Sequence, residues 1–209
     1  MRLNRFHSLI IAASLGVSLT AGLTSSASAQ SAEQVRLRGS IIQASNAALK
    51  VKTREGRTVD VTLAEGARVS GVARASVNDI KPGDYVGIAS LPKADGGDGA
   101  LEVLIFPPAL KGAGEGSYGW DLKPNSTMTN ATVANAVKGV DGRTVTVTYH
   151  GQEKKIAIPD GTPIVTLASA TTADLKPGAI VFIVAAKTAS GGFASHQVVV
   201  GTNGVVPPM

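Results

Sequence analysis

The chain has 209 residues, no cysteine, and a formal charge of +5 from 20 Lys and Arg against 15 Asp and Glu. The missing cysteine excludes disulfides and thiolate metal sites, and so mild a basic charge without clustered Lys and Arg does not favour a nucleic-acid partner. Short alternating apolar runs, separated by Gly, Asp and Pro, predict an all-β fold. Without disulfides, such a fold must be stabilised by its apolar core alone.

The first 29 residues have the features of a secretory signal peptide. Arg2 and Arg5 give a positive start, an apolar run follows from Leu9 to Leu23, and Ala27 to Ala29 forms an A-x-A cleavage sequence. We expect cleavage after Ala29 and a periplasmic or secreted mature protein, whose charge falls to +3 because two Arg are removed. A retained membrane helix is the weaker alternative, because the run is short and broken by polar residues. No later stretch approaches the ~20 apolar residues that a membrane span needs.

Two segments of the chain repeat at a fixed offset of 95 residues. The sequence Asp79 to Gly83 (DIKPG) corresponds to Asp174 to Gly178 (DLKPG). The same offset aligns Gly56 with Gly151, Glu65-Gly66 with Asp160-Gly161, Gly96-Gly97 with Gly191-Gly192, and residues 103–105 with 198–200. One register kept over these separated matches predicts two homologous tandem barrel domains, at 33–107 and 130–206, joined by a linker at 108–129.

Each copy is predicted to contain five short strands. Alternation is clearest at 144–149, where Val145, Val147 and Tyr149 are expected to point to one face of the strand and the three threonines to the other. The predicted strands are 35–43, 48–54, 57–63, 84–91 and 100–106 in the first copy, and 131–138, 144–149, 155–158, 180–185 and 196–200 in the second.

A single helical turn is expected between the third and fourth strands of each copy. Ser76 with Asp79, and Thr171 with Asp174, have the spacing of a capping box in which Asp replaces Glu. The Lys-Pro-Gly that follows ends the turn. This order predicts two five-stranded, partly open barrels of the OB type; an SH3-like barrel or a five-stranded sandwich is the alternative. The structural repeat motif comprises Asp79, Pro82, Gly83, Asp174, Pro177 and Gly178.

The repeat motif resembles that of a known family. The pattern Asp-Ile/Leu-Lys-Pro-Gly-x-x-Val, after a helical turn and before an apolar strand, is similar to small exported bacterial β-barrel domains of unknown function that often occur in tandem. The segment WDLKPNSTMTNATV, residues 120–133, resembles one found in a subset of those proteins. Some similar sequences are labelled metal ABC transporter permease, a label that this sequence does not support because it has no bundle of membrane spans. The resemblance implies a fold and no particular activity.

The linker contains the only tryptophan of the chain. Its first half, residues 111–119, is rich in glycine and expected to be mobile. Because a lone Trp is costly to leave in water, we expect Trp120 to pack where the two domains meet, as an inter-domain clasp. The alternative is a binding role, in which Tyr118, Trp120 and Asp121 form an exposed platform for a sugar or a peptide.

Candidate metal ligands are few. The mature chain has two histidines, His150 at a hairpin turn and His196 at the start of the last strand, without the spacing of a zinc or copper site. Asp95 and Asp98 lie in one loop near Glu102, where a hard cation would need more oxygens. All four are weak candidates, and we expect neither a metal nor another cofactor.

No motif predicts a reaction. Ser117 lacks the spacing of a nucleophile elbow, and a Gly-x-Gly-x-x-Gly match at Gly114, Gly116 and Gly119 is followed by Pro124 rather than by a regular helix. The sequence therefore favours an exported, non-enzymatic protein for binding or envelope maintenance, whose partner is an envelope protein, a polymer or a small molecule. A periplasmic metal-handling accessory protein is the first alternative, and a hydrolase of envelope polymers is the second.

Overall fold

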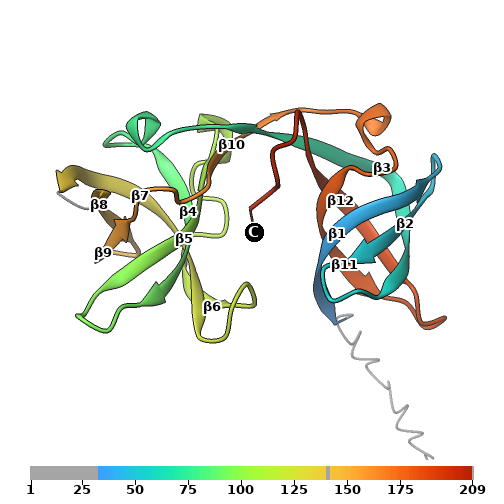
Figure 1. Ribbon diagram of the computed structural model, residues 1–209, viewed down its shortest axis with the longest axis horizontal. Coiled ribbons are helices and arrows are strands. Elements are labelled where there is room, and N and C mark those ends of the chain that lie inside the picture. The colour runs from blue at the N-terminus through green and yellow to red at the C-terminus, as the bar shows by residue number, and fades with distance from the viewer. Residues whose placement is uncertain (1–32, 140–141, 209) are drawn as a thin grey trace, which may run out of the picture. The chain divides into compact units, whose positions relative to one another are not determined.

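The computed structural model describes residues 33–139 and 142–208, so the expected signal peptide lies outside the described residues. Within them the chain is all-β, as predicted (Figure 1). The strands are β1 (Gln34–Ala44), β2 (Ala48–Thr53), β3 (Thr58–Arg74), β4 (Tyr85–Pro92), β5 (Asp98–Ile105), β6 (Gly116–Trp120), β7 (Ser126–Gly139), β8 (Gly142–Tyr149), β9 (Gln152–Ile158), β10 (Ile164–Ser169), β11 (Ile180–Lys187) and β12 (Phe193–Gly201). Single 3-10 turns lie at η1 (Val77–Asp79), η2 (Pro108–Leu110) and η3 (Thr172–Asp174).

Every predicted strand is present, but three features of the strands were missed. The third strand, β3, is 17 residues long in total and ends at Arg74, whereas the prediction ended it at residue 63. It does so through a bulge, where Gly66 adopts a φ of 70° and the register with β12 shifts. Strands β6 and β10 were not expected at all, and β7 begins at Ser126 inside the expected linker.

The first barrel is a closed ring of β1, β2, β3, β12 and β11. Antiparallel pairs join β1 to β2, β2 to β3, β11 to β12 and β11 to β1, and a parallel pairing of β3 with β12 closes the ring. Apolar side chains that alternate along these strands fill it and are almost completely buried. They include Leu37, Val51, Val61, Ile183 and Val198.

The second barrel is a ring of β7, β8, β9, β5 and β4. Its pairs are antiparallel except for a short parallel contact of β5 with β9, which joins Asp98 to Ile156 and Gly99 to Ala157. Val145 and Val147 point to one face, as expected, and both are completely buried. Strand β6 adds to this sheet by pairing with the first half of β7.

Each barrel takes strands from both repeats. The first barrel combines the three strands at 34–74 with the last two at 180–201, and the second combines β4 and β5 with the first three strands of the second repeat, β7, β8 and β9. The barrels therefore do not coincide with the contiguous segments 33–107 and 130–206 that the sequence suggested. We call this arrangement strand exchange. It follows from β3, because a strand that continues to Arg74 instead of turning back carries the rest of its repeat, β4 and β5, into the other barrel (Figure 1).

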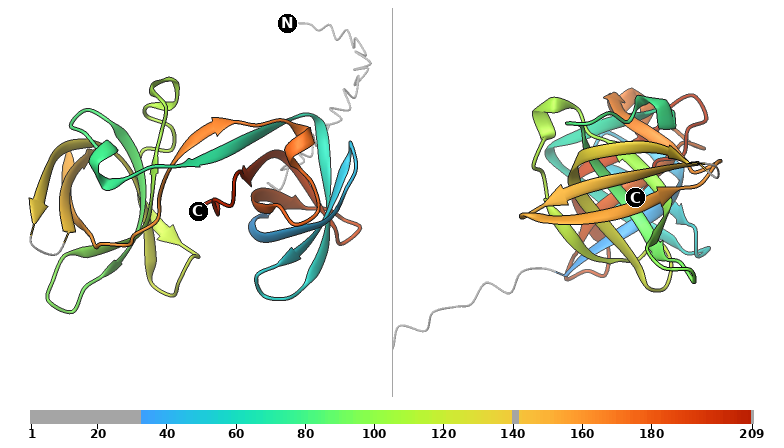
Figure 2. Two further views of the ribbon diagram at one scale, coloured as in Figure 1. Left: turned by 45° about the horizontal axis from the view of Figure 1, so that its top comes forward. Right: turned by 90° about the vertical axis from the view of Figure 1, so that its left-hand side faces the viewer.

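The crossing strands β3 and β10 are related by approximate two-fold symmetry. They pair antiparallel, with Val72 opposite Leu167, and these two residues are separated by the repeat offset of 95. The parallel contact of Val103 with Ile164 likewise corresponds to that of Val198 with Val69. Figure 2 shows both strands passing between the barrels. A third apolar cluster lies here and includes Val72, Leu104, Val165, Phe182 and Val199.

The capping boxes form as predicted and attach each helical turn. The backbone N–H of Ser76 donates to Asp79 Oδ2 at 2.8 Å, and that of Thr171 donates to Asp174 in the same way. Hydrogen bonds from the side chain and backbone of Ser76 lower the pKa of Asp79. After the prolines, Gly83 and Gly178 adopt positive φ values and donate their N–H to the first strand of the opposite repeat, at Val133 and Ile41.

Candidate functional site

Trp120 lies at the seam, which we define as the contact between the β6–β7 hairpin and the outer face of the first barrel. Its ring centroid is 6.5 Å from that of Phe182 and 6.1 Å from that of Tyr118. The guanidinium of Arg36 lies 4.0 Å from the ring centroid, within the range of a cation–π contact. Trp120 is partly buried, whereas Tyr118 is 40% exposed. The indole therefore packs at the place where an inter-domain clasp requires it, while Tyr118 and Asp121 of the expected platform remain exposed.

Asp121 extends this contact with charge. Arg38 Nη2 donates to its Oδ1 at 2.8 Å, Arg36 lies 3.9 Å from its Oδ2, and Arg54 Nη2 donates to its backbone oxygen at 3.0 Å. Burial alone would raise the pKa of Asp121, but the hydrogen bond from Arg38 and the charges of Arg38 and Arg36 outweigh it and lower the pKa. The hairpin is thus bound to the first barrel by one acidic residue among three arginines.

The depressed pKa predicts how Asp121→Asn will behave. At pH 7 the substitution should lower the free energy of unfolding by at most about 1 kcal/mol, because the carboxylate is largely exposed and screened. Because the pKa of Asp121 is lower in the folded protein than in the unfolded chain, its carboxylate stabilises the folded state at pH values above the unfolded pKa of about 3.9. This contribution disappears as the pH falls through the pKa of the folded state. Urea unfolding at pH 7 and pH 3 should therefore show a difference that shrinks in acid. A difference that is equal at both pH values would contradict the ionic role.

The polar residues around Trp120 shape the hairpin. Asn125 adopts a φ of 62°, and Ser126 Oγ lies 2.9 Å from the oxygen of Trp120 and 2.8 Å from that of Lys123. Asn130 Nδ2 donates to the oxygen of Gly114 and to the Tyr118 hydroxyl, each at 3.1 Å. The hydrogen bonds of Ser126 and Asn130 therefore order residues 114–130, a segment that lies largely within the predicted linker.

A solvent-open cavity of about 530 Å³ lies at the seam. Residues on the outer face of β1 and β2 form one wall, since Leu37 and Val51 on the same strands point into the barrel. The other walls of the cavity are formed by β5 of the second barrel, by the β6–β7 hairpin, by β11 and by the chain after β12. The lining residues are Arg38, Gly39, Ser40, Lys52, Thr53, Arg54, Glu102, Leu122, Ile180, Val181, Val206 and Pro207. The volume lies in the range of small-molecule sites, which is about 300–1,000 Å³.

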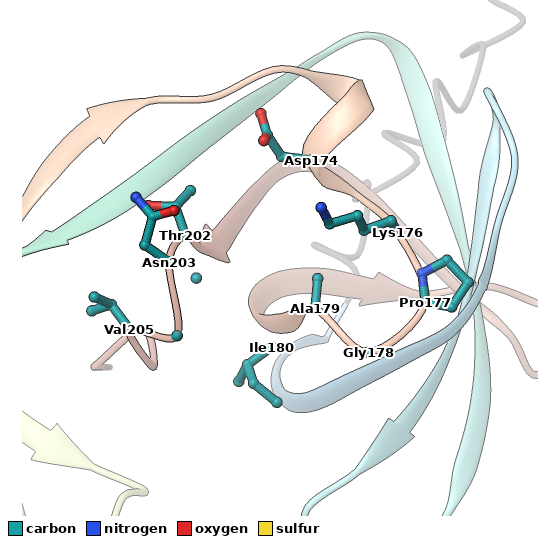
Figure 3. Close-up of a pocket in the computed structure, with 11 residues that line it drawn as sticks. Asp174, Lys176, Pro177, Gly178, Ala179, Ile180, Thr202, Asn203 and Val205 are labelled. Carbon is teal, nitrogen blue, oxygen red and sulfur yellow. The ribbon is translucent and has the colours of Figure 1, made fainter.

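A second cavity, of about 510 Å³, lies beside the second Lys-Pro-Gly turn. Figure 3 shows Lys176 on one side of it and Thr202 and Asn203 on the other. Several of its polar groups already have protein partners: Asp174 accepts from Thr171, and Thr202 Oγ1 donates to the oxygen of Val72. Because these groups are occupied in holding the turn and the chain end, we regard this cavity as the weaker candidate.

The weak metal candidates are not brought together. His150 is exposed at the β8–β9 turn of the second barrel, and His196 is exposed on β12 of the first. Asp95 pairs with Lys93, and Asp98 pairs with Lys154 Nζ at 2.6 Å. Within residues 33–139 and 142–208, no three His, Asp or Glu side chains gather closely enough to hold a metal ion.

Lys154 was missed by the sequence interpretation. Besides Asp98, its Nζ lies 3.4 Å from the hydroxyls of Thr127 and Thr129, and Ser90 Oγ donates to Asp98 at 2.9 Å. Because Asp98 and Lys154 belong to β5 and β9, the network spans the parallel contact that closes the second barrel. Its residues lie on strands that are far apart in sequence, so no local motif could have indicated it.

Ser117 and the Gly-x-Gly-x-x-Gly match both lie in or next to β6, where they contribute to the sheet. Ser117 Oγ lies 2.9 Å from the hydroxyl of Thr129, within the β6–β7 pair. Gly114, Gly116 and Gly119 lead into and through β6, and strand β7 follows in place of a helix. A nucleotide-cradling loop requires that helix, so the geometry gives this motif no phosphate site.

Comparisons with known proteins found no matching protein-family model, curated protein or solved structure. Among the described residues, no helix has the length and apolar character that crossing a membrane requires.

Proposed function

We propose that the chain is an exported binding protein of the cell envelope, built from two OB-like barrels, and that its ligand occupies the seam cavity. The observation that carries the proposal is the cavity itself, whose size and mixed lining suit a small molecule. Export follows from the predicted signal peptide, and the helical turn between the third and fourth strands of each barrel agrees with an OB-type order.

The strand exchange supports a binding role because it gives the cavity firm walls. Two contacts, of β3 with β10 and of β10 with β5, connect the barrels through backbone hydrogen bonds. A site whose walls lie on strands is held more precisely than one on loops. The cavity walls at β1, β2, β5 and β11 meet this requirement.

The test is native mass spectrometry of the full mature chain recovered from the compartment to which it is exported. We expect a bound small molecule on the wild type, and its loss in Ser40→Phe, which places a ring in the cavity. The control is Thr58→Phe, on an exposed site outside the seam cavity, and circular dichroism should show native melting for both variants. A wild type without any bound mass, or one whose bound mass survives Ser40→Phe, would contradict the proposal. A bound metal would instead favour the metal-handling alternative.

A further inference from the structure

The first-barrel wall of the seam cavity carries three cations. Arg38, Lys52 and Arg54 line the cavity from β1 and from the end of β2. Thr53 lies between the last two but is 3% exposed and, by strand alternation, shares the barrel-facing side of β2 with Val51. Hydrogen bonds with the side chains of Arg54 and Thr53 are among the causes that lower the pKa of Glu55, so the Thr53 hydroxyl has a protein neighbour. The wall therefore offers positive charge to a molecule in the cavity.

The cations are arranged before any ligand arrives. Arg38 and Arg54 are both fixed by Asp121, one through its carboxylate and the other through its backbone oxygen, and Arg54 Nε also donates to Glu55 at 2.9 Å. The charges of Arg38 and Arg54 are thus partly compensated, whereas Lys52 forms no ion pair with any described residue and is the main charge offered to a ligand. Side chains that are already ordered bind an anion with little further loss of side-chain entropy.

The rest of the lining is apolar, apart from one carboxylate. Leu122, Ile180, Val181, Val206 and Pro207 face the cavity, and Val206 keeps 61% of its surface exposed. Glu102 lines the cavity from the second barrel and is 8% exposed. Its charge disfavours a second anionic group in the same space, so the lining suits one anionic head and an apolar body.

Resting on the function proposed above, we propose that the seam cavity binds a small amphipathic organic anion. The head group lies against Lys52 and Arg54, where charge-assisted hydrogen bonds are available. The apolar body covers Ile180, Val206 and their apolar neighbours. The ligand class is thus set by residues of both repeats, which meet only because the strands are exchanged.

The only tryptophan provides a direct readout. The guanidinium of Arg38 lines the cavity and also lies 5.8 Å from the centroid of the Trp120 ring, so occupancy of the cavity should change the Trp120 emission. The full mature chain is titrated with octanoate below its micelle-forming concentration. Octan-1-ol keeps the apolar chain without the charge, octylammonium reverses the charge, and acetate keeps the head alone. We expect saturable octanoate binding that is at least about tenfold tighter than that of each analogue.

Variants test the assignment of the head-group site. Lys52→Gln should weaken octanoate binding by about tenfold or more while leaving the fold intact. The matched control is Lys155→Gln, which removes an equally exposed charge from the second barrel and should leave the affinity unchanged. Circular dichroism melting checks that each variant is folded.

The outcomes separate this inference from the function on which it rests. Equal binding of octanoate and octan-1-ol, or equal weakening by Lys52→Gln and Lys155→Gln, would overturn the anion assignment. If none of the probes binds while mass spectrometry finds a cationic or neutral molecule that Ser40→Phe removes, the anion inference fails and the binding function survives. If no probe binds and no bound mass is found, both fail.

Discussion

Replacing Trp120 by alanine should lower the free energy of unfolding by about 2–4 kcal/mol, whereas Trp120→Phe should lower it by less than about 1 kcal/mol. The indole packs against Phe182 and beneath Arg36 at the seam, and alanine would leave that space empty. The indole N–H is buried without a hydrogen-bond partner among the described residues. Phenylalanine keeps an aromatic ring in place and removes that unsatisfied donor, which offsets part of the lost volume.

The measurement is urea unfolding followed by circular dichroism, because neither variant retains a tryptophan to report by fluorescence. The two unfolding curves should keep the slope of the wild type, so that the midpoints can be compared directly. Equal losses in the two variants would show that the ring retained by phenylalanine contributes nothing at the seam, which would contradict the packing argument. A Trp120→Ala variant as stable as the wild type would exclude the clasp.

Lys154→Met should lower the free energy of unfolding by about 2–3 kcal/mol. Removing one partner of a buried ion pair leaves the other charge without compensation and typically costs about 3–5 kcal/mol. The side chains of Lys154 and Asp98 are 21% and 15% exposed, so water reduces that penalty here. The effect should still be large because the parallel contact of β5 and β9 that closes the second barrel involves only two residue pairs.

A double-mutant cycle distinguishes the ion pair from packing of the lysine stem. Asp98→Asn alone should also destabilise, and combining it with Lys154→Met should cost less than the sum of the two single changes. Lys155→Met, on the exposed side of the same strand, is the control and should change stability by less than about 0.5 kcal/mol. Additive losses at Lys154 and Asp98 would show that the two groups do not act together.

Ten of the twelve strands could be predicted from sequence because their signals are local, whereas β6 and β10 were not predicted. Val145 and Val147 alternate with threonines, and the capping boxes at Ser76 and Thr171 fix where the helical turns start. These signals depend on neighbours along the chain and on the two-residue period of a strand. The all-β class followed from them directly.

The exchange of strands could not be predicted because the two repeats are alike. The second half of either repeat carries the same Lys-Pro-Gly turn and a similar apolar strand, so it fits either barrel equally well. The choice is made at residues 64–74, where β3 continues through its bulge instead of turning back. A glycine at Gly66 suits a turn as well as a bulge, and its sequence context does not distinguish them.

The cavity was missed for a related reason. Lys52, Glu102, Ile180 and Val206 line one space but come from four distant parts of the chain. The packing of Trp120 could be predicted because a lone tryptophan among small polar residues needs a packing partner. Its partners, Phe182 and Arg36, could be identified only once β11 was seen to pair with β1.

The exchange of strands is tested most directly by cutting the chain between the repeats. A protease site inserted between Lys111 and Gly112, both exposed, divides the chain without entering either barrel. Since each barrel contains strands of both fragments, the cut protein should elute as one species from a gel-filtration column in native buffer. The fragments should separate only over the urea range in which the uncut protein unfolds, and the same should hold when Trp120→Ala removes the clasp. Two fragments that separate in native buffer, each still folded, would contradict the exchange and restore two contiguous barrels.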